Sequence, residues 1–240
     1  MEELIHITAT YSNALLVAIL PHISDFAQKL DLPITQPITT AQVLRFNANP
    51  YKGHLSGTVV LTDHSWFSFD QRGFVDSFTS PTNWFSEQED FAANLPRYLG
   101  QTKMTTNEVV AFAREALVKL GYGPELTHAD TAPVLQGPFN PEKGGHVPFC
   151  RVLWEPIKDQ DNDGYSRVKV EINTQQKTVV GLYLGFARTN KIGTPLKIDV
   201  EPETQAEFRK RTKAAMFVRT NAPPRAPGNS PSPLSPKTSD

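Results

Sequence analysis

Apolar and polar residues alternate most regularly over residues 165–184. Charged side chains stand between the apolar ones in the first part of this segment, which is typical of a strand with one solvated face. A second apolar run follows after a short polar turn, so the segment is predicted to form a β-hairpin. Its apolar positions are Val168, Val170, Ile172, Val180, Leu182 and Leu184, and its charged positions are Arg167, Lys169 and Glu171.

A second hairpin is predicted over residues 66–78. Two aromatic strands flank the tetrapeptide 70–73, whose composition suits a type I turn in which Gly73 takes a positive φ. Strand-like runs with β-branched residues precede it between residues 43 and 62. The first half of the chain therefore predicts a meander of short antiparallel strands.

Helical periodicity is found in two long segments. Apolar residues recur at helical spacing over residues 12–30, where Pro21 should kink the helix or divide it in two. Thr105 and Glu108 form a capping box that opens a second amphipathic helix, which ends at Gly121. Two shorter helices are expected over residues 86–95 and 202–217.

The two halves of the chain share an order of elements: a helix that ends in Lys-Leu, a proline-rich loop, strands, and a hairpin whose turn begins with an Asx residue. This order indicates a tandem helix-plus-meander unit, while a chance match between two common arrangements explains it equally well. The predicted fold class is α+β, with antiparallel β-meanders packed on helices. The units are assigned to residues 1–100 and 101–219, and the Pro- and Ser-rich tail 220–240 is predicted to be disordered.

The hairpin over residues 165–184 carries the pattern x-V-x-V-x-I-[DN]-x-x-[TQ]-x-x-V. A helix followed by such a meander resembles the PepSY and cystatin-like class of small α+β domains, over residues 105–184 and, more diverged, over 12–79. The glycine usual in the turn of that family is replaced by Gln176 or Lys177, whereas Gly73 retains it in the first unit. The resemblance implies a non-enzymatic binding or regulatory module, often outside the cytoplasm and associated with peptidases. It transfers no functional residue, because the motif is structural.

Composition and charge point to no particular class of partner. Lys plus Arg number 24 and Asp plus Glu 25 among 240 residues, so a net charge of −1 gives no indication of nucleic-acid binding. The apolar run 14–20 is too short to span a bilayer, so no membrane span is expected. The acidic start Met1–Glu3 does not look like a signal peptide, which favours the cytoplasm by default, or export if a leader is missing. The oligomeric state is left open.

Asp159, Asp161 and Asp163, followed by Gly164, have the spacing that opens a calcium-binding loop. The closing ligand is missing, because Val170 occupies the twelfth position of such a loop. An acidic hairpin turn is the competing interpretation, and the sequence favours it. Calcium is therefore a hypothesis for the three aspartates, and no other metal or cofactor is predicted.

Aromatic side chains are dense between residues 66 and 85. Neighbouring residues of a strand point to opposite faces, so either both faces are covered or one presents an apolar patch to a partner. A protein or peptide would be the partner of such a patch, and burial in a core is the competing interpretation. The candidate binding residues are Trp66, Phe67, Phe69, Trp84 and Phe85.

Chemically reactive residues form no recognisable catalytic set, and no catalytic residue is assigned. The six histidines show no HxxxH or HExxH spacing, and no serine lies in a GxSxG elbow. Cys150 is the only cysteine, which excludes an intramolecular disulfide, and its strand-like neighbours favour a buried, inert thiol. The sequence thus favours a non-catalytic protein- or peptide-binding module. The alternative is a small-molecule-binding domain or enzyme with a pocket between helix and curved sheet.

Overall fold

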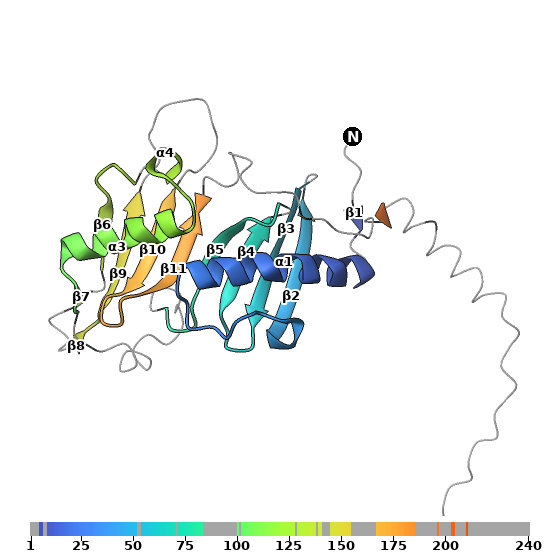
Figure 1. Ribbon diagram of the computed structural model, residues 1–240, viewed down its shortest axis with the longest axis horizontal. Coiled ribbons are helices and arrows are strands. Elements are labelled where there is room, and N and C mark those ends of the chain that lie inside the picture. Colours follow the sequence, from blue (N-terminus) through green and yellow to red (C-terminus); the bar gives the residue numbers. More distant parts are fainter. Residues whose placement is uncertain are drawn as a thin grey trace, which may run out of the picture.

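An eight-stranded antiparallel sheet forms the body of the protein. The computed structural model describes residues 5–6, 9–51, 54–70, 72–83, 100, 102–127, 129–137, 139–140, 145–154, 167–185, 196, 203–204 and 210. The strands follow the order β2-β3-β4-β5-β11-β10-β9-β6 across the sheet (Figure 1). Their bounds are β2 Val43–Tyr51, β3 His54–Leu61, β4 Trp66–Asp70, β5 Val75–Thr79, β6 Val134–Gln136, β9 Phe149–Trp154, β10 Val168–Asn173 and β11 Thr178–Leu184.

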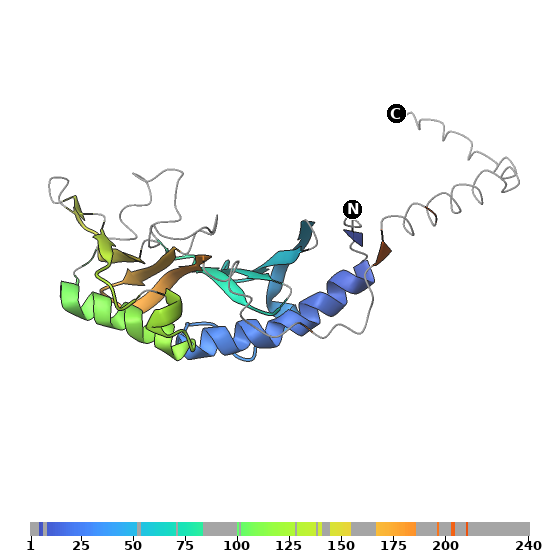
Figure 2. The ribbon, with the colours of Figure 1, turned by 90° about the horizontal axis from the view of Figure 1, so that it is seen from above.

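Two long helices lie on the same face of the sheet (Figure 2). Helix α1 (Ala9–Lys29) crosses β2 to β5, and α3 (Thr106–Lys119) lies over β9 and β10. The sheet thus has a helix-covered face and an opposite face, called here the distal face, and the predicted α+β class is confirmed. The smaller elements are η1 Thr40–Gln42, α4 Pro124–Thr127, the strand pair β1 Ile5–His6 with β12 Glu203–Thr204, and the pair β7 Phe139–Asn140 with β8 Gly145–His146.

Both helices follow from local sequence. Thr105 and Glu108 form the predicted capping box, in which Glu108 Oε2 accepts from Thr105 N at 2.7 Å. Helix α1 contains Pro21 but is not divided there. Buried Ile19 and Ile23 on either side of the proline pack on the same sheet, and this packing offsets the lost backbone hydrogen bond.

The predicted hairpin of β10 and β11 is confirmed. Asn173 Oδ1 accepts from Gln175 N and Gln176 N, both at 3.0 Å, and closes the turn as an Asx residue does. Lys177 takes the left-handed conformation, with φ 55°, which glycine adopts more readily than other residues.

The hairpin of β4 and β5 is built in the same way. Asp70 Oδ1 accepts from Arg72 N at 2.8 Å, and Gly73 takes the predicted positive φ of 73°. A Cβ atom on Gly73 would lie 2.7 Å from Cε1 of His22 in α1. The positive φ favours glycine at this position, and the imidazole of His22 would have to move to admit a larger residue.

The core lies between the helices and the sheet. Phe67 of β4 is fully buried, and its ring centroid lies 6.2 Å from that of Phe26 in α1 and 5.1 Å from that of Phe78 in β5. Trp154 of β9 is only 1% exposed, and its Nε1 donates to the carbonyl oxygen of Thr131 at 3.3 Å. Aromatic packing therefore anchors α1 to its half of the sheet, and Trp154 ties β9 to the segment between α4 and β6.

Strands β5 and β11 join the two halves of the sheet, along a line that we call the seam. Each half contributes a helix and four strands, and the last strand of each half lies at the centre. The register pairs Gly181 with Thr79, Leu182 with Phe78 and Tyr183 with Ser77. The two predicted units thus share one sheet, and their duplication stays a prediction.

Several expected segments lie outside the described residues. These are the helix over 86–95, most of the helix over 202–217 and the tail 220–240. Glu203 and Thr204 form β12, so these two residues of the expected helix pair with β1 instead.

Replacing Phe67 with alanine should lower the free energy of unfolding by about 3–5 kcal/mol, because it leaves a cavity beneath α1. Urea unfolding measures the change. Val17→Ala, at a residue of α1 that is 61% exposed, is the control and should change stability by less than about 0.5 kcal/mol. Equal losses in the two variants would contradict the assignment of Phe67 to the core.

Candidate functional site

The predicted aromatic residues divide between the two faces of β4. Phe67 and Phe69 point toward the helices and are fully buried in the core. Trp66 points to the distal face, where its side chain is half-buried. Trp84 and Phe85 lie outside the described residues. Of the described candidates, only Trp66 is therefore placed to touch a partner while the core stays closed.

The calcium hypothesis concerns residues on which the structure gives no information. Asp159, Asp161 and Asp163 lie outside the described residues, so the hypothesis stays a prediction. Among the residues that are described, no group of three or more His, Cys, Asp or Glu side chains could hold a metal ion.

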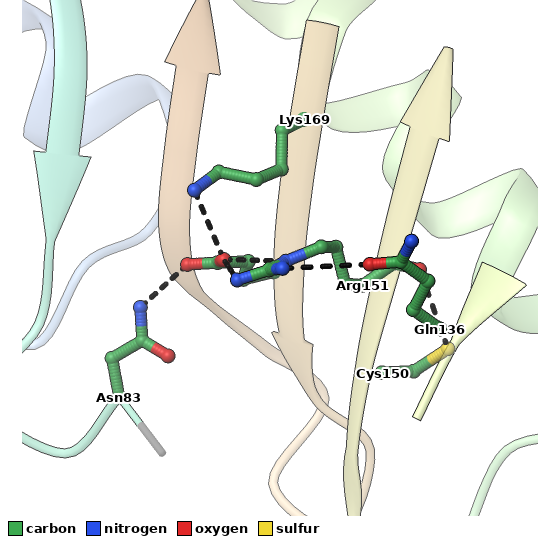
Figure 3. A network of polar contacts seen from close by, with 6 residues as sticks. Asn83, Gln136, Cys150, Arg151 and Lys169 are labelled. Atoms are coloured by element: carbon green, nitrogen blue, oxygen red, sulfur yellow. Dashed lines mark hydrogen bonds and ion pairs between the residues drawn. The ribbon is translucent and has the colours of Figure 1, made fainter. Parts of the chain in front are cut away.

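A polar cluster occupies the distal face of β9 and β10, with labelled members shown in Figure 3. Its centre is Glu171, which is 3% exposed. Oε1 of Glu171 accepts from Arg151 Nε at 2.8 Å and lies 3.2 Å from Lys169 Nζ, and its Oε2 accepts from Asn83 Nδ2 at 2.6 Å. The prediction of a solvated Glu171 is wrong, because these three side chains surround the carboxylate.

Gly181 provides the space for this carboxylate. It is the cross-strand neighbour of Glu171 on β11, and a Cβ atom there would collide with Glu171 Oε2 and lie 2.6 Å from Asn83 Nδ2. Asn83 follows β5 whereas Glu171 belongs to β10, so their hydrogen bond crosses the seam. A glycine inside a strand is a sequence signal for such a close approach, and it was the one indication of this cluster.

The cluster is suited to holding the fold together. Each oxygen of Glu171 already accepts from a nitrogen donor, and the carboxylate is almost inaccessible. Removing one partner of a buried charge leaves the other without compensation, which is strongly destabilising. We therefore assign Glu171 and Asn83 a role in joining the two halves of the sheet.

A cleft of about 190 Å³ lies on the helix side of the seam. Residues of α1 form one wall, the β4–β5 turn forms the second, and the segment that follows α3 forms the third. Both halves of the protein therefore contribute to it. Its polar and aromatic lining includes His22, Asp25, Lys29, Arg72, Phe74 and Tyr122.

Charged groups at the cleft are paired within the protein. Lys29 Nζ lies 2.8 Å from Asp25 Oδ2, and Arg72 Nε donates to Asp70 Oδ2 at 2.7 Å. Burial raises the pKa of Tyr122 to about 12, and the carboxylates of Asp25 and Asp70 act in the same direction. Tyr122 is thus a neutral hydroxyl at physiological pH, beside equal numbers of positive and negative charges.

The single thiol is not an activated nucleophile. Cys150 is half-buried against the core, and burial raises the pKa of its thiol. The thiolate, which is the reactive form, is therefore disfavoured at neutral pH.

Strand β2 forms one edge of the sheet and β6 forms the other. The edge at β6 is three residues long, whereas that at β2 is nine, and β2 has only β3 as a strand neighbour in the described part of the chain. A bulge between Val43 and Arg45 interrupts the pairing at one end, and Pro50 lies near the other. Both features discourage pairing at an edge, but they leave residues 45–49 regular.

Comparisons with known proteins give little beyond this geometry. No protein-family model matches the chain, and no curated protein matches it. Among solved structures, the Bacillus megaterium YpeB C-terminal domain is similar at 12% identity, over 80% of this chain and 72% of that chain, with a TM-score of 0.36. A likeness of this size carries no conclusion about function. Within the described residues, no helix is long and apolar enough to cross a membrane.

Gly181→Ala should lower the free energy of unfolding by about 1–3 kcal/mol, because the methyl group displaces the Glu171 carboxylate. Asn83→Ala tests the same contact from the other side. If the two changes break one interaction, chemical denaturation should show that their effects do not add in the double variant. Additive losses would contradict a shared contact across the seam.

Alkaline titration should reveal a tyrosine that ionises near pH 12, and Tyr122→Phe should remove that phase. The folded state disfavours ionised Tyr122, so this residue leaves stability unchanged below its ordinary pKa of 10.0 and lowers it between pH 10.0 and about 12. Absorbance of tyrosinate measures the first effect, and unfolding at each pH measures the second. An unaltered titration curve in the variant would exclude Tyr122 as the source.

Proposed function

We propose that this protein is a non-catalytic module that binds an extended segment of a partner protein along β2. The unpaired edge of β2 carries the proposal, because edge strands offer backbone groups that a partner strand can complete. The sequence resemblance to PepSY-like domains implies a binding role of the same general kind. The proposal places the partner at the sheet edge, whereas sequence pattern alone favours the aromatic region around Trp66.

Backbone geometry determines which N–H and C=O groups of β2 a partner strand would bind. Pro50 has no N–H, so it suits a position whose nitrogen faces away from β3. Pairing is regular from Arg45 to Tyr51, and alternate residues of an antiparallel strand face the same way. Phe46 and Ala48 therefore direct their N–H and C=O groups outward, and an incoming strand would form its hydrogen bonds with them.

The occupant that fits this edge is a single extended segment. In both ribbon views the N-terminal turns of α1 extend past β2, over the place of a ninth strand (Figures 1 and 2). The short β1–β12 pair lies beyond the edge and pairs within itself. A second copy of this chain fits less well than a lone strand, because its own α1 would extend over the same place.

The helix-covered side of the edge favours apolar residues in the partner. Phe46 and Ala48 are partly buried and pack against the core, and the Phe46 ring stacks on Phe69 at a centroid distance of 5.9 Å. Side chains of an added strand alternate between the two faces. The segment should therefore carry apolar side chains at alternate positions, beside Phe46 and Ala48.

Ala48→Pro tests the proposal, because it removes one outward N–H without removing a bond to β3. Peptides selected from a random-sequence display library against the wild-type protein should show alternating apolar residues. They should bind the variant at least about tenfold more weakly in fluorescence polarisation. Ala48→Val retains the N–H group and serves as the control.

Hydrogen exchange on the wild-type protein gives an independent measurement. Bound peptide should protect the amides of Phe46 and Ala48, whatever the stability of the proline variant. Selected peptides that bind all three proteins equally, or that leave both amides unprotected, would overturn the proposed mode of binding.

A further inference from the structure

The cleft at the seam is a second candidate site, separate from the β2 edge. It opens where the C-terminal part of α1 meets the β4–β5 turn and the segment after α3, so it draws residues from both halves of the sheet. Ligand sites occur preferentially at such junctions between packed units. A ligand held here would contact both halves at once.

The aromatic surface that a ligand could reach in this cleft is the ring of Tyr122, which is half-buried. Phe26 and Phe74 are almost fully buried, and the Tyr122 ring lies 5.5 Å from Phe74 between centroids. A volume of about 150 Å³ is large enough for benzene. At about 190 Å³, this cleft has room for one ring and a short polar extension at its mouth.

The rim of the cleft carries a negatively and a positively charged side chain close together. Asp25 and Lys29 lie one helical turn apart on α1, with side chains 60% and 44% exposed, and form an ion pair of 2.8 Å. A lone anion would compete with Asp25 for Lys29, and a lone cation would compete with Lys29 for Asp25. A ligand with a carboxylate beside an ammonium group pairs with both residues and leaves no charge uncompensated.

From these features we propose that the cleft binds a small zwitterion with one apolar side chain, a free α-amino acid. Its ammonium group pairs with Asp25, its carboxylate with Lys29, and its side chain lies against the ring of Tyr122. Gly73 keeps the cleft open beneath His22, since a side chain at this position would meet the imidazole. Because Tyr122 belongs to the second half, a bound ligand would stabilise the seam.

Calorimetric titration with three probes tests the proposal. L-phenylalanine has both charges, 3-phenylpropionate lacks the ammonium group, and phenethylamine lacks the carboxylate. L-phenylalanine should bind in the millimolar range or tighter and raise the melting temperature. Each analogue should bind at least about tenfold more weakly. No binding of L-phenylalanine, or equal binding of the three probes, would overturn the proposal.

The double variant Asp25→Asn, Lys29→Gln locates the site. Both residues are largely exposed, so the fold should persist. L-phenylalanine should bind this variant at least about tenfold more weakly than it binds the wild type. Glu115→Gln removes a matched exposed ion pair on α3 and should bind normally. Unchanged affinity in the double variant would place the ligand elsewhere and overturn the proposal, whatever the outcome for peptide binding at β2.

Discussion

The pairing of β5 with β11 is the contact on which the rest of the molecule depends. It joins two groups of four strands into one sheet through three residue pairs. Contacts on both faces of the sheet reinforce this short junction. Asn83 donates to the buried Glu171 on the distal face, and Lys119 lies 3.0 Å from Asp31 on the helix side. Without the seam, β5 and β11 would each be an exposed edge.

The division of the sheet into two unlike faces locates the sites. The face beneath the helices is filled by apolar side chains, so Phe67 and Phe69 serve the core and no partner can reach them. On the distal face the charges around Glu171 are paired with one another. In the part of the chain that the structure describes, the β2 edge has no strand partner on its outer side, and the cleft beside Tyr122 has unfilled space. The proposed functions follow from these two places.

Local features of the fold were predictable from the sequence. Period-2 alternation locates β10, and the pairing of Thr105 with Glu108 locates the start of α3, because both depend on residues close together in the chain. The turns closed by Asp70 and Asn173 also depend only on neighbouring residues, because each side chain accepts from backbone N–H groups within the same turn. Pro21 shows the limit of prediction from local sequence. The lost backbone hydrogen bond is known from the sequence, but the packing of α1 that offsets this loss is not.

The candidate sites were far less predictable. Alternation placed Glu171 opposite the apolar face, but it could not show that Asn83, 88 residues away, covers the carboxylate. The cleft likewise combines His22 with Tyr122, and the β2 edge exists only because no other described strand pairs there. Such features depend on which edges and surfaces meet, and many pairings satisfy the same local pattern.

By itself, then, the sequence determined the identity of the main helices and hairpins and the face to which each side chain of β4 and β10 points. Those properties follow from backbone periodicity, which acts over a few residues. Only the tertiary structure decided that Trp66 and Phe67 have different environments, that Glu171 is buried and that β5 meets β11. These outcomes depend on packing between segments distant in the chain, because the burial of each side chain depends on which strands pair and which surfaces meet.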